Sequence, residues 1–374
     1  VPQIRFAGFT DPWEQRKLGE LFEESDERAS DREILSVSVA NGIYPASESD
    51  RETNPGASLA NYKIVHFGDV VYNSMRMWQG AVDASRYDGI VSPAYVVARP
   101  NSEVYARFFA RLLRQPMLLK QYQQVSQGNS KDTQVLKFDD FASIGISMPV
   151  SENEQRQIGG FFDRLDSLIT LHQRKYDKLC VLKKSMLDKM FPKGGSLYPE
   201  IRFSGFTDPW EQRKLGELYK EVSEKNDLTY GRDRIISVAH MYFNPVVYVT
   251  EDDYLKTYNV MRLGDIAFEG NRSKNFAHGR LVENTIGDGI VSHVFKVFRP
   301  IQPFDLMYWK YSINNEKAMK DVLTRSTKAS TMMHELVAKD FLNEEIAVPS
   351  LEEQRQIGAF FDRLDSLITL HQRK

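Results

Sequence analysis

The sequence predicts an α+β protein with two mixed α/β domains of one fold, separated by long helices that pair as an antiparallel coiled coil. Three observations predict this architecture: a close tandem repeat, β-type motifs that recur in each half, and a seven-residue apolar period after each half. Length and composition agree, since 374 residues with 41% apolar content suffice for two core-forming domains.

The tandem repeat consists of two blocks that each occur twice. The first reads PQIRFAGFTDPWEQRKLGEL and returns with two changes, and the second reads EQRQIGGFFDRLDSLITLHQRK and returns with one. They occupy residues 2–21 and 199–218, and residues 154–175 and 353–374. The regions between them, residues 22–153 and 219–352, share little sequence. We therefore predict a repeated frame, formed by the two blocks, and two different intervening regions, which are called the fillings below.

The first block of each half contains an Asp-Pro-Trp segment, at Asp11-Pro12-Trp13 and at Asp208-Pro209-Trp210. Asp is a good helix cap and Pro is favoured in the first helical turn. We therefore predict a short helix at each place.

The fillings share a strand skeleton. Gly-Asp before an apolar run and Asp-Gly-Ile-Val-Ser each occur once per filling, and a β-rich run then ends in Arg-Pro. Asp-Gly before β-branched residues is a turn-then-strand signal. We predict paired strands around Gly68–Tyr72, Asp88–Pro100, Gly264–Phe268 and Asp288–Pro300, and helices over residues 104–124 and 304–323.

The second block predicts a long helix between Pro149 and Pro192, with a loop after it. Its apolar residues form two rows with a seven-residue spacing, which is the seam pattern of a coiled coil. The rows are Ile158, Leu165, His172, Leu179 and Met186, and Phe162, Ile169 and Tyr176; the second copy has Ile357, Phe361, Leu364, Ile368 and His371. His172 and His371 occupy equivalent positions, where a polar residue can fix register or simply face solvent.

We predict four segments: a first domain over 1–153, a central spacer helix over 154–194, a second domain over 195–352 and a C-terminal spacer helix over 353–374. Antiparallel pairing of the two helices gives an internal pseudo-twofold. Two dissimilar domains at the ends of such a spacer suit two separated, dissimilar half-sites on a DNA duplex.

The repeated blocks together with the Gly-Asp and Asp-Gly-Ile-Val-Ser skeleton resemble the specificity subunit of Type I restriction-modification enzymes over the whole chain. The resemblance implies that the domains are target recognition domains, each reading half of a split double-stranded DNA sequence. It also implies that the helices dock two methylation subunits, with two restriction subunits in the full complex. S-adenosylmethionine, ATP and Mg then belong to partner subunits, and this chain is a non-catalytic subunit without a cofactor.

Composition agrees with a non-catalytic cytoplasmic chain. The sequence has no phosphate-binding glycine loop or HExxH motif, its seven histidines lack ligand spacing, and Cys180 is its one cysteine, so we predict no metal and no disulfide. Asn244-Pro245-Val246-Val247 lacks the second Pro and the aromatic of an adenine-methyltransferase motif, so a strand or turn is favoured. Neither an export signal nor a membrane span is expected.

The net charge of −2 gives no sign of a nucleic-acid partner, so any basic surface must be local. Residues 99–137 hold seven basic and two acidic residues, whereas residues 22–52 hold nine acidic ones. We predict a basic face over the first range, with the acidic stretch turned away or meeting a partner.

Two polar segments in each domain are candidates for DNA contact. One follows the Gly-Asp strand, at Asn73–Gly80 and Gly270–Arg280, and the other follows the helical region as a hydroxyl-rich loop, at Ser126–Thr133 and Thr324–Thr331. Arg and Asn read base edges, while Lys and hydroxyls grip phosphate; for Met77, Trp78 and Phe276, core packing is the alternative. The candidates are Ser74, Arg76, Gln79, Asn129, Ser130, Lys131, Thr133, Arg272, Lys274, Asn275, His278, Arg325, Thr327 and Lys328.

Each copy of the second block contains two consecutive phenylalanines, and a single coiled-coil seam can bury only one ring of each pair. We predict that Phe161, Leu168, Phe360 and Leu367 dock the methylation subunits; packing against their own domain is the alternative. Three other functions remain open: an orphan or alternative specificity subunit that directs methylation only, a self-sufficient DNA enzyme, and a protein-binding coiled-coil scaffold.

Overall fold

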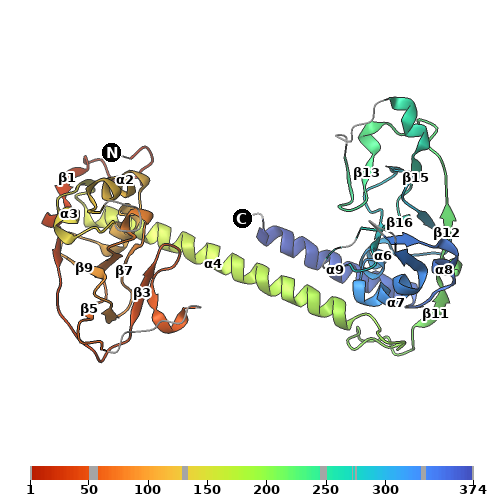
Figure 1. The fold of residues 1–374 in the computed structure, drawn as a ribbon, viewed down its shortest axis with the longest axis horizontal. Helices are drawn as coiled ribbons and strands as arrows, with labels where there is room; N and C mark the ends of the chain where they lie inside the picture. Colours follow the sequence, from red (N-terminus) through yellow and green to blue (C-terminus); the bar gives the residue numbers. More distant parts are fainter. Residues whose placement is uncertain are drawn as a thin grey trace. The chain divides into compact units, whose positions relative to one another are not determined.

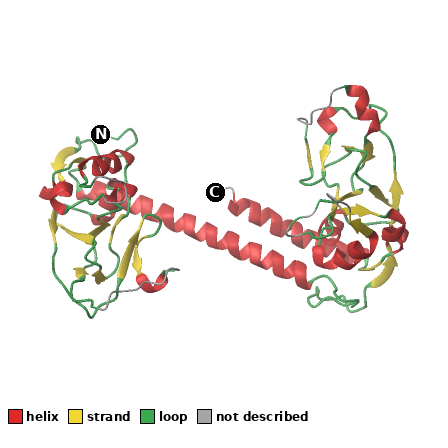
Figure 2. Cartoon of the chain, in the orientation of Figure 1, coloured by secondary structure: helices red, strands yellow, loops and turns green. Residues whose placement is uncertain are grey.

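The computed structural model describes residues 2–49, 58–128, 134–244, 251–271, 273, 276–329 and 334–372. Contacts divide the chain into two compact units, Val1–Thr170 and Leu171–Lys374. Each unit combines an antiparallel sheet with short helices (Figures 1 and 2), which confirms the predicted α+β class with two mixed domains. The four predicted segment boundaries stay predictions.

The first unit is built on a four-stranded antiparallel sheet in the order β2-β9-β6-β7, with three further strand pairs, β1-β10, β3-β4 and β5-β8. Its strands are β1 (Glu14–Lys17), β2 (Phe22–Glu24), β3 (Leu35–Ser38), β4 (Gly42–Pro45), β5 (Lys63–Val65), β6 (Val70–Asn73), β7 (Val82–Ala84), β8 (Gly89–Val91), β9 (Tyr95–Pro100) and β10 (Gly145–Met148). Its short helices are α1 (Ala106–Leu112), α2 (Pro116–Val125) and α3 (Phe138–Ala142), with 3₁₀ turns η1 (Leu18–Glu20), η2 (Ala46–Glu48) and η3 (Met77–Gln79).

Strand alternation gives this sheet two buried faces. Val70 and Tyr72 of β6 pack with the aromatic residues of the short helices, whereas Val71 between them packs with Leu35 of β3 and Val65 of β5. Successive side chains of a strand point to opposite faces, so one strand serves both cores.

The second unit repeats this topology, with a sheet in the order β12-β19-β16-β17 and the pairs β11-β22, β13-β14, β15-β18 and β20-β21. Its strands are β11 (Glu211–Lys214), β12 (Tyr219–Val222), β13 (Ile236–Ser237), β14 (Tyr242–Phe243), β15 (Asn259–Met261), β16 (Ile266–Glu269), β17 (Arg280–Glu283), β18 (Gly289–Val291), β19 (Val297–Pro300), β20 (Thr327–Ala329), β21 (His334–Leu336) and β22 (Glu345–Val348). Its helices are α5 (Leu215–Leu218), α6 (Leu306–Ile313), α7 (Glu316–Ser326), α8 (Ala338–Asn343) and α9 (Leu351–Gln372), with 3₁₀ segments η4 (Arg232–Arg234) and η5 (Asp252–Thr257).

The predicted strand skeleton and helical regions are confirmed, and each helical region is divided in two. Pro116 starts α2 and Asn315 caps α7, where its side chain accepts hydrogen bonds from Lys317 N and Ala318 N. The helix predicted between Pro149 and Pro192 is also confirmed, as α4 (Glu152–Lys189).

The short helices predicted at the Asp-Pro-Trp segments are wrong. The chain there runs into β1 and β11, which pair with β10 and β22. The tryptophans decide the local structure: Trp13 lies 5.9 Å from Phe108 and donates to Glu154, and Trp210 is buried. Anchoring Trp in the domain core outweighs the local capping preference.

A buried ion pair fastens the first repeated block to the helix that begins with the second. Arg5 donates to both carboxylate oxygens of Glu154, at 2.6 and 2.7 Å, and Arg202 does the same to Glu353, at 2.7 and 2.8 Å. Both carboxylates are 1% exposed. The bidentate geometry fixes the helix start against its own domain.

In the second unit, the latter half of α4 packs antiparallel to α9. Lys183 donates to Asp365 at 2.5 Å, and Nδ1 of His172 lies 2.9 Å from Nδ1 of His371. Residue numbers rise along α4 as they fall along α9, which confirms the predicted antiparallel pairing over this half. Ile357, Phe361 and Leu364 are buried there against α4 residues that include Leu179 and Met186.

Along its first half, α4 leaves much of the predicted seam exposed. Phe162, Leu165 and Ile169 are 40%, 41% and 56% exposed, although their counterparts Phe361 and Leu364 are buried. Ile158 packs against the apolar core of the first domain, and Glu154, Gln155 and Gly159 near the start of the helix are buried.

Candidate nucleic-acid interface

The recurring Gly-Asp motif has a structural role. It forms the turn before β6 and β16, the strands that lead into the candidate segments Asn73–Gly80 and Gly270–Arg280. The carboxylate of Asp69 accepts a hydrogen bond from His66 N at 2.9 Å, and that of Asp265 accepts one from Arg262 N at 2.8 Å. Each closes the turn that opens β6 or β16. Burial raises the pKa of both carboxyls, and the facing arginines Arg99 and Arg299 oppose this rise.

The Asp-Gly-Ile-Val-Ser motif supports the same turn from the other side. Asp88 accepts from Phe67 N at 3.0 Å, and Asp288 accepts from Leu263 N at 2.8 Å. The Arg-Pro end of the next strand supplies the guanidinium for the buried aspartate, with Arg299 at 2.9 Å from Asp265. The shared skeleton therefore holds two strand ends in equivalent positions, and the residues that follow them differ between the domains.

In the first unit, the first candidate segment contacts the chain just after the second one. Ser74 O accepts from Leu136 N at 2.8 Å, so the chain after β6 touches the chain that follows the hydroxyl-rich segment. The Ser74 hydroxyl donates to Ala94 O at 2.7 Å, whereas Arg76 and Gln79 are exposed. Met77 is fully buried, which confirms the core alternative for that residue.

In the second unit, the first candidate segment likewise contacts the chain that follows the second one, at His334. Gly270 O accepts from His334 N at 2.8 Å, and the ring of His278 lies 5.1 Å from that of His334. His334 was missed from the sequence because nothing in its own neighbourhood marks it. Only the contact with Gly270 places it beside His278.

The segment Thr324–Thr331 is not the loop that the sequence predicts. Its first residues form the last turn of α7 and the next three form β20. Arg325 makes bonds of 2.5 to 3.0 Å to the carboxylate of Glu344, while the Thr327 hydroxyl donates to Leu323 O and Lys328 is exposed opposite Glu335. Of the three candidates here, Arg325 and Lys328 are exposed, but the guanidinium of Arg325 is paired with Glu344.

Seven candidates lie outside the described residues: Asn129, Ser130, Lys131, Thr133, Arg272, Lys274 and Asn275. The Pro245-Val246-Val247 part of the methyltransferase-like tetrapeptide lies outside them too.

Carboxylates and a carbonyl hold the four arginines of the basic face predicted over residues 99–137, whereas Lys120 and Lys137 of the same range are exposed. Arg107 bonds Asp83 and Asp163, Arg111 bonds Asp163 and Asp166, and Arg114 donates to Val82 O. Arg99 binds Glu27, a member of the acidic stretch expected to face away. Arg107 and Arg111 therefore belong to an ion-pair network within the first unit and are not free cations.

Asp163 is the centre of that network. Although burial opposes it, hydrogen bonds from Arg107 and Arg111 lower the pKa of Asp163 to about 2. This carboxylate is therefore ionised at neutral pH and ties α1 to α4 within the first unit.

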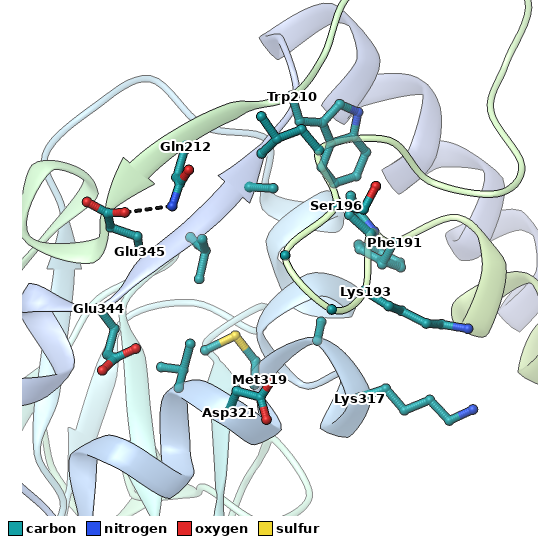
Figure 3. A pocket seen from close by; sticks show the side chains of 18 of the residues that line it. Phe191, Lys193, Ser196, Trp210, Gln212, Lys317, Met319, Asp321, Glu344 and Glu345 are labelled. Atoms are coloured by element: carbon teal, nitrogen blue, oxygen red, sulfur yellow. Dashed lines mark hydrogen bonds between the residues drawn. The ribbon is translucent and has the colours of Figure 1, made fainter.

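A pocket of about 480 Å³ lies in the second unit between α7, the β11-β22 pair and the loop after α4 (Figure 3). Lys193 and Lys317 at its edge both bind Asp188, Arg325 binds Glu344, and Gln212 donates to Glu345 at 2.6 Å. Carboxylates thus neutralise the cationic side chains of this pocket, so its lining does not favour the binding of an anion.

The four residues predicted to dock partner subunits are at least partly accessible. Phe161, Leu168 and Leu367 are 48%, 52% and 38% exposed, and Phe360 is partly buried. Each aromatic also meets the first repeated block of its own unit edge-on, with Phe161 5.8 Å from Phe6 and Phe360 5.8 Å from Phe203. The alternative, packing against their own domain, therefore accounts for part of their surface.

Replacing Lys183 with Ala is expected to lower the free energy of unfolding of the second unit by about 1 kcal/mol, because its ion pair with Asp365 is half-buried. Lys184→Ala is the control, since Lys184 is exposed and makes no ion pair among the described residues. Denaturant titration should separate the two variants; equal effects would mean that the ion pair adds nothing to the helix pairing.

Among the described residues, no group of three or more His, Cys, Asp or Glu side chains is arranged to hold a metal ion. Within the same residues, no helix is both long and apolar enough to cross a membrane.

Two mixed α/β domains of one topology, each leading into the same repeated helix, define a duplicated two-domain protein with a helical scaffold. The sequence profile described as Type I restriction modification DNA specificity domain matches residues 10–180 and 207–374, once in each half. The chain belongs to this family.

Three relatives share between 13% and 23% of their residues with this chain. The specificity subunit of the Type I restriction enzyme MjaVIII from Methanocaldococcus jannaschii is 23% identical over 63% of this chain and 58% of its own length. The HsdS subunit from Thermoanaerobacter tengcongensis is similar over 97% of this chain and 91% of its own, with 18% identity and a TM-score of 0.49. The S subunit of M. genitalium gives 13% identity and a TM-score of 0.48 over 100% of this chain and 94% of its own.

Proposed function

We propose that this chain is the DNA-specificity subunit of a Type I restriction-modification system and that each domain binds one half of a bipartite, gapped sequence. One observation carries the proposal: the two units share topology and frame, yet differ in the segments that follow β6 and β16. A shared scaffold with different exposed segments suits two different half-sites in double-stranded DNA.

The repeated helices are the proposed docking sites for two methylation subunits. Phe161 and Leu168 recur as Phe360 and Leu367, and all four keep some solvent exposure. Residues that stay the same in both copies while the fillings diverge suit one partner that binds twice. Two restriction subunits would join the full complex.

No step of catalysis is assigned to this chain. Methyl transfer to adenine would use S-adenosylmethionine held by the methylation subunit, and ATP- and Mg-dependent cleavage would belong to the restriction subunit. A chain that acts with methylation subunits alone, without a restriction subunit, is the runner-up; co-purification of a restriction subunit from the host decides between them.

The near-identity of the two frames allows a direct test. A variant in which residues 219–352 replace residues 22–153 should, when co-expressed with the methylation subunit, methylate two copies of the second half-site. The native chain should methylate two different halves with a fixed gap. Single-molecule sequencing of methylated adenines in host DNA measures both.

Unchanged motifs after the exchange, or a native motif that is not split, would contradict the two-reader proposal. Binding of the variable domains to their partner that persists at high salt would favour the protein-binding scaffold, since DNA affinity falls steeply with ionic strength.

A further inference from the structure

The β13-β14 hairpin of the second unit has a strained tip. Met241 has φ of 48°, in the left-handed region that favours glycine. The corresponding β3-β4 hairpin of the first unit places Gly42, with φ of 66°, at the end of its turn. A side chain at this position costs backbone energy, so the second hairpin must be held by contacts elsewhere.

Arg280 supplies those contacts. Its guanidinium donates to Ala239 O at the tip, at 2.8 Å, and to Glu269 at the end of β16, at 2.6 Å. The same group lies 5.2 Å from the ring centre of Phe276. One largely buried arginine therefore joins the hairpin tip to both ends of the candidate segment Gly270–Arg280.

The first unit holds its hairpin against the same strand with different residues. Ile43 N donates to Asp83 of β7 at 3.3 Å, and Arg107 binds the other oxygen of that carboxylate. The hairpin thus lies beside the strand after the first candidate segment in both units. Its anchoring residues, like its tip, are specific to each domain.

The tip of the second hairpin carries side chains that suit DNA. Tyr242 is 48% exposed, His240 is exposed, and their ring centres lie 6.3 Å apart. A phenol and an imidazole can donate hydrogen bonds to phosphate or to base edges. The first unit has Asn41 and Gly42 at this tip, so the two tips offer different chemistry.

We propose that the β13-β14 hairpin tip is a third DNA-contacting segment of the second domain, with His240 and Tyr242 as its contacting side chains. This inference rests on the proposed function, because it assigns new residues to the same DNA surface. The bond from Arg280 to Ala239 O places the turn that carries these two rings next to the start of β17, where the candidate segment ends.

The test compares Tyr242→Ala and His240→Ala with Tyr254→Ala, each co-expressed with the methylation subunit. Tyr254 is the matched control, since it is also 48% exposed in the same unit but lies next to Glu251, Asp252 and Asp253, which repel phosphate. The hairpin variants should lower the methylation rate at cognate sites roughly tenfold or accept additional bases in the second half-site only. The control should match the native chain.

Hairpin variants that match the Tyr254 control in both rate and motif would overturn the proposal. Thermal unfolding of each purified variant checks folding, and Tyr242→Phe, which keeps the ring, gives the same readout if the Ala variant is unstable. A failure of the proposed function would be recognised separately, because the native chain would then direct methylation to no split motif.

Discussion

Replacing Phe361 with Ala is expected to lower the free energy of unfolding of the second unit by about 3–5 kcal/mol. This ring is fully buried, and it lies 6.1 Å from Phe191 and 5.2 Å from Tyr311. Truncation removes apolar burial and leaves a cavity between α9, α6 and the end of α4.

The chain contains its own control for this substitution. Phe162 occupies the same place in the other copy of the repeated block but is 40% exposed, so Phe162→Ala should cost about 1 kcal/mol or less. Denaturant unfolding followed by hydrogen exchange assigns each loss to a unit. Similar losses for the two variants would show that Phe361 is not more deeply buried than Phe162 in solution.

Replacing Glu283 with Gln is expected to stabilise the second unit at neutral pH. The carboxyl of Glu283 is 2% exposed, and neither oxygen has a hydrogen-bond partner among the described residues. Burial raises the pKa of Glu283 from 4.5 to about 10, so the folded protein keeps this group protonated at pH 7. Gln fills similar volume and carries no charge to neutralise.

The size and the pH dependence of this effect follow from linkage. Between pH 4.5 and 10 the folded state binds a proton that the unfolded state has lost, so the native chain loses stability as pH rises through this window. At pH 7, holding this proton on Glu283 in the folded state costs about 3 kcal/mol of stability, at the usual 1.36 kcal/mol per pKa unit. The Gln variant should gain that amount, and the gain should vanish near pH 4.

Thermal unfolding of the native chain and of Glu283→Gln between pH 4 and pH 8 measures this difference. Glu335→Gln is the control, because Glu335 is exposed on β21 of the same unit. The first unit has Ala84 where β17 carries Glu283, so the shared fold does not need a carboxyl there. A gain that does not change with pH would mean that Glu283 is ionised in the folded protein.

Features that depend on repetition or local pattern could be predicted from the sequence. Comparing the chain with itself gave two domains of one topology, and the apolar period between Pro149 and Pro192 gave α4. The Gly-Asp and Asp-Gly motifs gave strands because their turns are closed by neighbouring backbone groups.

Features that depend on distant partners could not be predicted in this way. Arg107 and Arg111 look like a basic face until α1 packs on α4, where Asp163 neutralises them. Capping preference at Asp11-Pro12 predicts a helix, but Trp13 finds its partners Phe108 and Glu154 far along the chain. His334 and the β13-β14 tip entered the candidate site for the same reason, since only the fold brings them beside Gly270–Arg280.

The contact between His172 and His371 breaks the equivalence of the two repeats. The two imidazoles are the same residue at the same place in each copy, yet their facing nitrogens lie 2.9 Å apart. A hydrogen bond at this distance needs a proton on one of the two Nδ1 atoms and a lone pair on the other, so the two rings cannot carry their protons in the same way. Two identical residues at equivalent places of the repeat therefore form an unequal pair, in which one ring donates the hydrogen bond and the other accepts it.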